Sequence, residues 1–163
     1  MQQPDYITRL GSLVIDHRLR RILDHLLEAQ AQVYAQEDIH FEPRWTSTFL
    51  LLEEEGPLGV TEIARRLQYT HPGIIKFTNG MIAADLIIQL DDPQDERRRL
   101  LQLSPRGKRL APRLHRIWGA LREAQSEIFK QAGCEVLNLL QRVDLELAKC
   151  PLAERVMQRL EKE

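Results

Sequence analysis

Apolar positions along the chain recur mainly at spacings of three and four residues, the pattern of amphipathic helices. The pattern predicts a long helix over residues 5–38 and further helices over residues 43–55, 60–68, from 70 onward, 105–131, 134–149 and 152–160. Glycine and proline mark most of the boundaries between these segments. We therefore expect a mainly helical fold.

Two of the predicted helices are short and closely linked. The first covers residues 60–68, the second begins at Thr70, and the turn between them holds only two or three residues around Gln68 and Tyr69. Thr70 is a favourable N-cap residue. The second helix is expected to bury one stripe, formed by Ile74, Phe77 and Met81. A short helix, a tight turn and a second helix make a helix-turn-helix, here over residues 59–84.

The segment after these helices changes period. Residues 86–90 and 100–103 are predicted strands, and the polar stretch between them is predicted to be a loop, so that residues 86–103 form a β-hairpin. A hairpin directly after a helix-turn-helix is a wing. Its tip is expected to carry Arg97, Arg98 and Arg99, with Asp95 placed to orient Arg97. An arginine there can enter a groove about 6 Å wide, whereas the alternative is a solvated loop with a weak local ion pair.

Charge is distributed unevenly. Residues 62–116 contain eleven Lys or Arg against six Asp or Glu, a net charge of +5, although the whole chain has −1. A basic middle between acidic ends suits phosphate binding.

The outward face of the helix that begins at Thr70 supplies the other candidate DNA contacts. The major-groove candidates are Thr70, His71, Gly73, Ile75 and Asn79, with Lys76 in reach of a phosphate. Taken singly, each is better explained as an ordinary exposed helix residue.

Together, these motifs resemble the MarR family of regulators, over the stretch from Phe41 to Lys108. Residues 56–67 (GPLGVTEIARRL) resemble the family's entry to the helix-turn-helix. The Asp-x-Arg at 95–97 and the Leu-Ser-x-x-Gly at 103–107 resemble its wing and the start of the next helix. Two positions that are usually glycine in the family are Gln68 and Asp85 here.

The resemblance implies a mainly α winged helix-turn-helix fold with a small β-hairpin wing. Residues 41–108 would bind DNA, and residues 1–40 and 109–163 would form a helical dimerisation region of the same continuous fold. It also implies a homodimer on a palindromic operator of double-stranded DNA, often a repressor relieved by a small-molecule effector. Arg97 would be the minor-groove residue, supported by Asp95.

Other function classes find little support in the sequence. It contains no nucleophile elbow, phosphate-cradling loop or zinc-protease motif, so neither an enzyme nor a cofactor is expected. The histidines lack the spacing of a helical metal site, and Cys134 and Cys150 are expected to be reduced, packed thiols rather than redox sensors. No membrane span or secretion signal is expected, which favours the cytoplasm.

Two alternatives remain open. The winged helix could be a protein-interaction module with weak or no DNA binding, in which Ile75, Ile82 and the apolar wing strand form a docking surface. A ligand carrier without a DNA function is the other.

Overall fold

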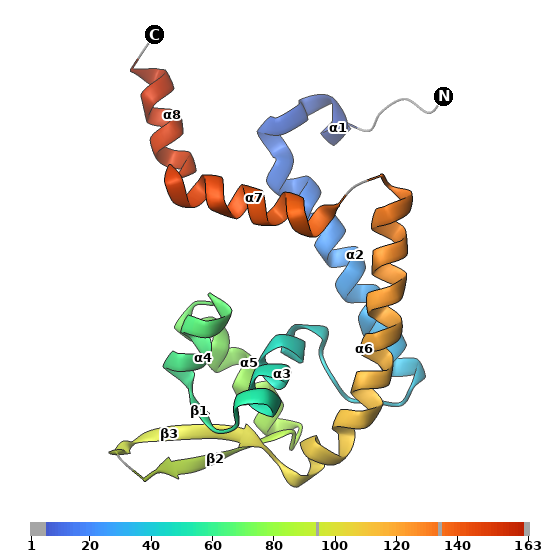
Figure 1. Ribbon diagram of the computed structural model, residues 1–163, viewed down its shortest axis with the longest axis vertical. Coiled ribbons are helices and arrows are strands. Elements are labelled where there is room, and N and C mark those ends of the chain that lie inside the picture. Colours follow the sequence, from blue (N-terminus) through green and yellow to red (C-terminus); the bar gives the residue numbers. More distant parts are fainter. Residues whose placement is uncertain (1–5, 94, 134, 162–163) are drawn as a thin grey trace. The chain divides into compact units, whose positions relative to one another are not determined.

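The computed structural model describes residues 6–93, 95–133 and 135–161, and only the backbone of residues 96–98 (Figure 1). The helices are α1 (Tyr6–Leu10), η1 (Gly11–Val14), α2 (Ile15–Gln36), η2 (Pro43–Trp45), α3 (Thr46–Glu55), α4 (Val60–Leu67), α5 (His71–Ala83), α6 (Pro105–Gln131), α7 (Val136–Lys149) and α8 (Leu152–Leu160). The strands are β1 (Leu58–Gly59), β2 (Ile87–Asp92) and β3 (Asp95–Leu103). The predicted winged helix-turn-helix is confirmed, with α4 and α5 as its helices.

The chain forms two compact units. The first ends at Ile117 and the second begins at Trp118, so the boundary falls within α6. The first unit holds the helix-turn-helix and the sheet, and the second holds the end of α6 with α7 and α8. No helix in the described part of the chain is both long enough and apolar enough to cross a bilayer.

The sheet has three antiparallel strands in the order β1-β3-β2, and α3, α4 and α5 lie on one side of it (Figure 1). The two strands of the hairpin extend further toward its turn than predicted, because β3 begins at Asp95 and pairs with β2 through Asp91 opposite Arg99. The prediction of a loop over residues 91–99, with the arginines at its tip, is therefore wrong, since Arg97, Arg98 and Arg99 belong to a strand. Strand β1 was not predicted, because two residues are too few to show a period.

The N-terminal helix is also less regular than predicted. The single helix expected over residues 5–38 is interrupted by the 3-10 turn η1. Gly11, the first residue of η1, has φ +64°, a left-handed conformation that does not continue an α-helix. The regular helix α2 then ends at Gln36.

The core of the first unit is built around an aromatic cluster. The ring of Phe41 meets those of Tyr34, Trp45 and Phe49 edge to face, at centroid distances of 5.2, 5.7 and 5.7 Å. All four side chains are buried. Edge-to-face pairs are favourable beyond their burial, so the cluster holds the end of α2, η2 and α3 together. Trp45 and Phe49 are nearly inaccessible, as is Leu52, so these three side chains form the inner face of this segment.

A compact junction fixes where α6 starts relative to the wing. The Ser104 hydroxyl donates a hydrogen bond to the Asp85 carbonyl at 2.6 Å and accepts one from the Gly107 amide at 2.9 Å. The Ser104 amide donates to the Leu86 carbonyl at 2.9 Å. At Gly107 a Cβ atom would lie 2.2 Å from the Leu86 carbonyl oxygen, so only glycine fits there. The Ser104 hydroxyl thus caps α6 and also ties this helix to the residues that precede β2.

Both positions at which the family usually has glycine adopt left-handed backbone. Gln68 and Asp85 each have φ +55°. Gln68 is the C-cap of α4, and its amide donates to the Ala64 carbonyl. These positions therefore keep the backbone that glycine favours while carrying side chains, at a cost in stability.

Candidate nucleic-acid interface

Helix α5 presents a polar face to solvent and an apolar face to the core. Ile74, Thr78 and Met81 are buried. The candidate contacts on the other side are exposed: His71, Ile75, Lys76 and Asn79. The predicted stripe needs one correction, because Thr78 is buried whereas Phe77 is only half-buried, with its ring edge-to-face to that of Tyr69.

The polar side chains of this face are free to bind a partner. Within the described residues, none of His71, Lys76 and Asn79 makes a side-chain hydrogen bond or an ion pair. An exposed lysine and histidine without an internal partner can meet a phosphate or a base edge at little reorganisation cost.

The first turn of α5 is held in place by its cap. Thr70 has extended backbone, and its hydroxyl accepts a hydrogen bond from the Gly73 amide at 3.3 Å. The predicted N-cap is confirmed. Because this hydroxyl already serves the helix, Thr70 is better placed to position the first turn than to read a base. Gly73 is half-buried, and a Cβ atom at this position would lie 3.0 Å from the Thr70 hydroxyl oxygen.

Arg99, the wing arginine whose side chain the structure describes, has a partner. The guanidinium of Arg99 forms an ion pair with the carboxylate of Asp91, directly across the hairpin. Both side chains are well exposed, so the pair braces the two strands without being buried. The side chains of Arg97 and Arg98 lie outside the described residues, and the proposed orientation of Arg97 by Asp95 lies there too. Asp91 was not singled out from the sequence, because only the strand register identifies it.

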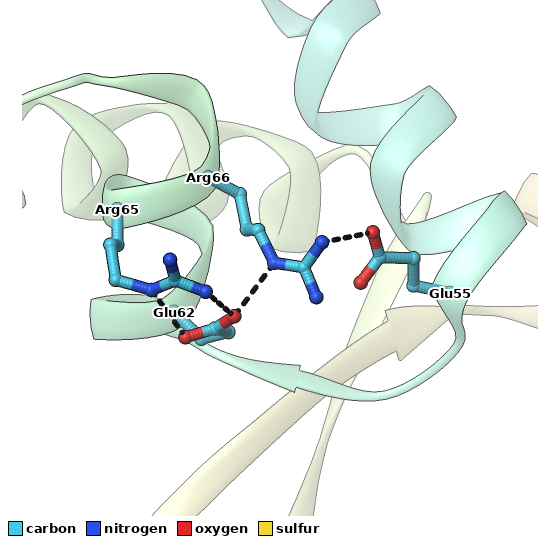
Figure 2. Close-up of polar contacts among 4 residues, drawn as sticks. All are labelled: Glu55, Glu62, Arg65 and Arg66. Atoms are coloured by element: carbon cyan, nitrogen blue, oxygen red, sulfur yellow. Dashed lines mark hydrogen bonds and ion pairs between the residues drawn. The ribbon is translucent and has the colours of Figure 1, made fainter.

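The other arginines of the helix-turn-helix are occupied by carboxylates (Figure 2). Glu62 accepts hydrogen bonds from Arg65, at 2.6 and 3.0 Å, and from Arg66 at 2.8 Å. Arg66 also reaches Glu55 of α3, at 2.8 Å. Hydrogen bonds from Arg65 first, and then from Arg66, lower the pKa of the Glu62 carboxyl to about 2. Arg66 therefore joins α4 to α3, whereas Arg65 is held within α4. Lys76 is left as the unpaired cation between Val60 and Ala83.

The docking surface of the alternative hypothesis is small. Ile75 is 39% exposed, but Ile82 is half-buried. On the wing, Ile87, Leu101 and Leu103 face the core and are buried. Among the residues named for that surface, Ile75 is thus the exposed apolar side chain.

The described residues contain no assembled metal-binding site. There, no three His, Cys, Asp or Glu side chains gather as metal ligands. Cys150 is half-buried beside the Pro151 carbonyl, and Cys134 lies outside the described residues.

Comparisons with known proteins identify the fold. No protein-family model matches the sequence, and no curated protein matches it. Among solved structures, the transcriptional repressor CouR bound to a 23-mer DNA duplex is 19% identical, has a TM-score of 0.67 and covers 88% of this chain and 99% of its own. A mutant MarR from E. coli complexed with operator DNA is 14% identical, with a TM-score of 0.65 and the same coverages. BpsR of Bordetella bronchiseptica is 16% identical, with a TM-score of 0.64, and covers 80% of this chain and 92% of its own. The chain therefore has the winged helix fold of the MarR-type regulators.

Proposed function

We propose that this winged helix chain is a MarR-family transcriptional regulator that binds double-stranded DNA as a homodimer. The observation that carries the proposal is the exposed outer face of α5, on which His71, Lys76 and Asn79 have no described internal partner. On this proposal α5 lies in the major groove. CouR and MarR, whose folds are similar, were solved bound to DNA.

The wing supplies the second contact. We assign the minor-groove contact to Arg97, with Arg98 beside it, because Arg99 is engaged by Asp91. A rigid two-stranded ribbon that carries cations suits contact with the minor groove and its phosphates. Asp95 remains the proposed support of Arg97.

Dimerisation would use the terminal helices. Many large apolar side chains on α2, α7 and α8 are exposed in the single chain, among them Leu19, Ile22, Leu140, Val156 and Leu160. Exposed apolar surface on the helices of each unit is characteristic of an interface. We assign residues 1–40 and 109–163 to dimerisation and residues 41–108 to DNA binding. Light scattering should give twice the chain mass.

The proposal also includes a small-molecule effector. In BpsR, whose fold is similar, DNA binding is regulated by 6-hydroxynicotinic acid. An effector would act on this chain only by binding more tightly to one of two dimer states that differ in DNA affinity.

Fluorescence anisotropy with duplexes selected from genomic fragments tests the DNA-binding proposal. Affinity should fall steeply as salt rises, because released counterions contribute to binding. Replacing the minor-groove residue, Arg97→Ala, should weaken binding by about 1 to 3 kcal/mol.

The matched control is Arg122→Ala, which removes an exposed arginine from α6 in the other unit. It should leave affinity within about two-fold, because Arg122 belongs to neither α5 nor the wing and an exposed charge outside the contact acts mainly through a screened potential. If Arg97→Ala binds like the control, the wing assignment is wrong. If no duplex binds at low salt, the proposed function itself is wrong.

A further inference from the structure

A groove lies in the first unit, between the loop that follows α2 and the N-terminal half of α6. Its volume is about 270 Å³. Three arginines of α6 line it, Arg106, Arg109 and Arg113, and His40 and Asp38 come from the loop. In Figure 1 these segments lie at the opposite end of the unit from the turn between β2 and β3.

The arginines of this helix differ in how their charges are compensated. Arg116, one turn beyond the groove, forms an ion pair with the Glu37 carboxylate. Arg113 donates to the Glu37 carbonyl at 2.5 Å, which orients its guanidinium without neutralising it. Arg106 and Arg109 make no ion pair or side-chain hydrogen bond with any residue that the structure describes. The groove therefore contains two uncommitted guanidinium groups and a third that is held in position.

This arrangement is electrostatically unfavourable in the empty protein. Arg106, Arg109 and Arg113 stand at i, i+3 and i+7, which places like charges on one face of the helix. Arg106 also lies in the first turn of the helix, where the helix dipole disfavours cations, and that turn contains no acidic residue. The Asp38 carboxylate is the one acidic group in the lining, and it pairs with none of them in the described structure. An anion in the groove would relieve this repulsion.

We propose that the groove binds the phosphate group of a small anionic molecule. Guanidinium groups offer paired donors that match phosphate oxygens, and Arg113 is already oriented by its bond to Glu37. The volume lies just below the usual range for ligand sites, about 300 to 1,000 Å³, so the groove suits a small molecule. Ile39 and Leu110 provide the apolar part of the wall. The site does not involve α5 or the wing, so its occupancy does not depend on the proposed DNA binding.

The test is a titration of the full chain with inorganic phosphate at constant ionic strength, followed by amide chemical shifts. Saturable shifts are expected at Ile39 and Leu110. The double variant Arg106→Gln with Arg109→Gln should weaken phosphate binding by about 10-fold or more, because each charge-assisted bond contributes strongly. The control, Arg122→Gln with Lys130→Gln, removes the same charge from exposed positions of α6 outside the groove, and should change binding less than about two-fold.

Shifts that do not saturate, or equal binding by the two double variants, would overturn the proposal. A parallel titration with duplex DNA tests the other possibility, which is that the groove contacts DNA. If DNA rather than phosphate shifts Ile39 and Leu110, the groove is a DNA contact and the small-anion proposal is wrong. If DNA shifts only amides of α5, the groove proposal stands. If DNA shifts no amide of α5, that result counts against the proposed function and not against the groove.

Discussion

Ser104 is expected to be one of the most sensitive polar positions of the first unit. Its side chain is fully buried, and its hydroxyl both caps α6 and bonds to the Asp85 carbonyl at 2.6 Å. Ser104→Ala loses the cap, worth about 1 kcal/mol. It also leaves a partly buried carbonyl without its donor, which costs about 1 to 2 kcal/mol more. The free energy of unfolding should therefore fall by about 2 to 3 kcal/mol.

Urea unfolding monitored by tryptophan fluorescence measures this change, because Trp45 is buried in the same unit. The matched control is Ser126→Ala, the same replacement at an exposed position of α6. It should change the free energy of unfolding by less than about 0.5 kcal/mol. If Ser104→Ala is as mild as this control, the junction does not hold the start of α6 in the way described.

Three further perturbations follow from the same structure. Gly80→Ala should lower the free energy of unfolding by about 1 kcal/mol or more despite alanine's helix propensity, because the new Cβ would lie 2.8 Å from the Trp45 ring; thermal unfolding would show it, and a rise in stability would contradict it. Gln68→Gly should raise stability by about 0.5 to 1 kcal/mol in urea, since φ is +55° there, and any loss would count against backbone strain at this turn. Glu62→Gln should lower the free energy of unfolding near pH 7. Because the pKa of Glu62 in the folded protein is about 2, the loss of stability relative to wild type should persist above pH 4.5 and vanish as pH falls toward 2. A loss of stability that does not depend on pH would exclude the ion pairs with Arg65 and Arg66 as its cause.

The helical part of the fold could be predicted because its signals are local. The caps at Thr70 and Ser104 and the apolar periodicity of α5 and α6 each depend on residues within a few positions of one another. The same holds for Gly133, which ends α6 with φ +72°. Such helices can be predicted because their capping residues, apolar periodicity and terminating glycines or prolines all indicate the same boundaries.

The errors share a physical cause, which is that pairing between segments has no local signature. The run of charged residues after Pro93 has the composition of a loop, yet it continues the ladder of β3 because β2 lies opposite it. The Arg99–Asp91 pair follows from that register alone. The occupation of Arg66 by Glu55, eleven residues away, likewise depends on how α3 packs against α4.

The positions of glycine show how tertiary structure and local preference combine. Although Gln68 and Asp85 replace the usual glycines, both keep the left-handed backbone. The structure accounts for the glycine at position 80, inside α5, by the close approach of Trp45. Tertiary packing therefore decides whether a residue with an unfavourable local conformational preference is tolerated at a given position.

The central claim is that two copies of α5 and the wing engage one DNA duplex. Hydroxyl-radical footprinting of the full chain on a selected genomic duplex tests it most directly. Two protected patches separated by about one helical turn, roughly 34 Å, are predicted, with both patches lost in the double variant His71→Ala and Lys76→Ala. Protection that survives this variant, or a duplex that is cleaved uniformly at low salt, would contradict the claim.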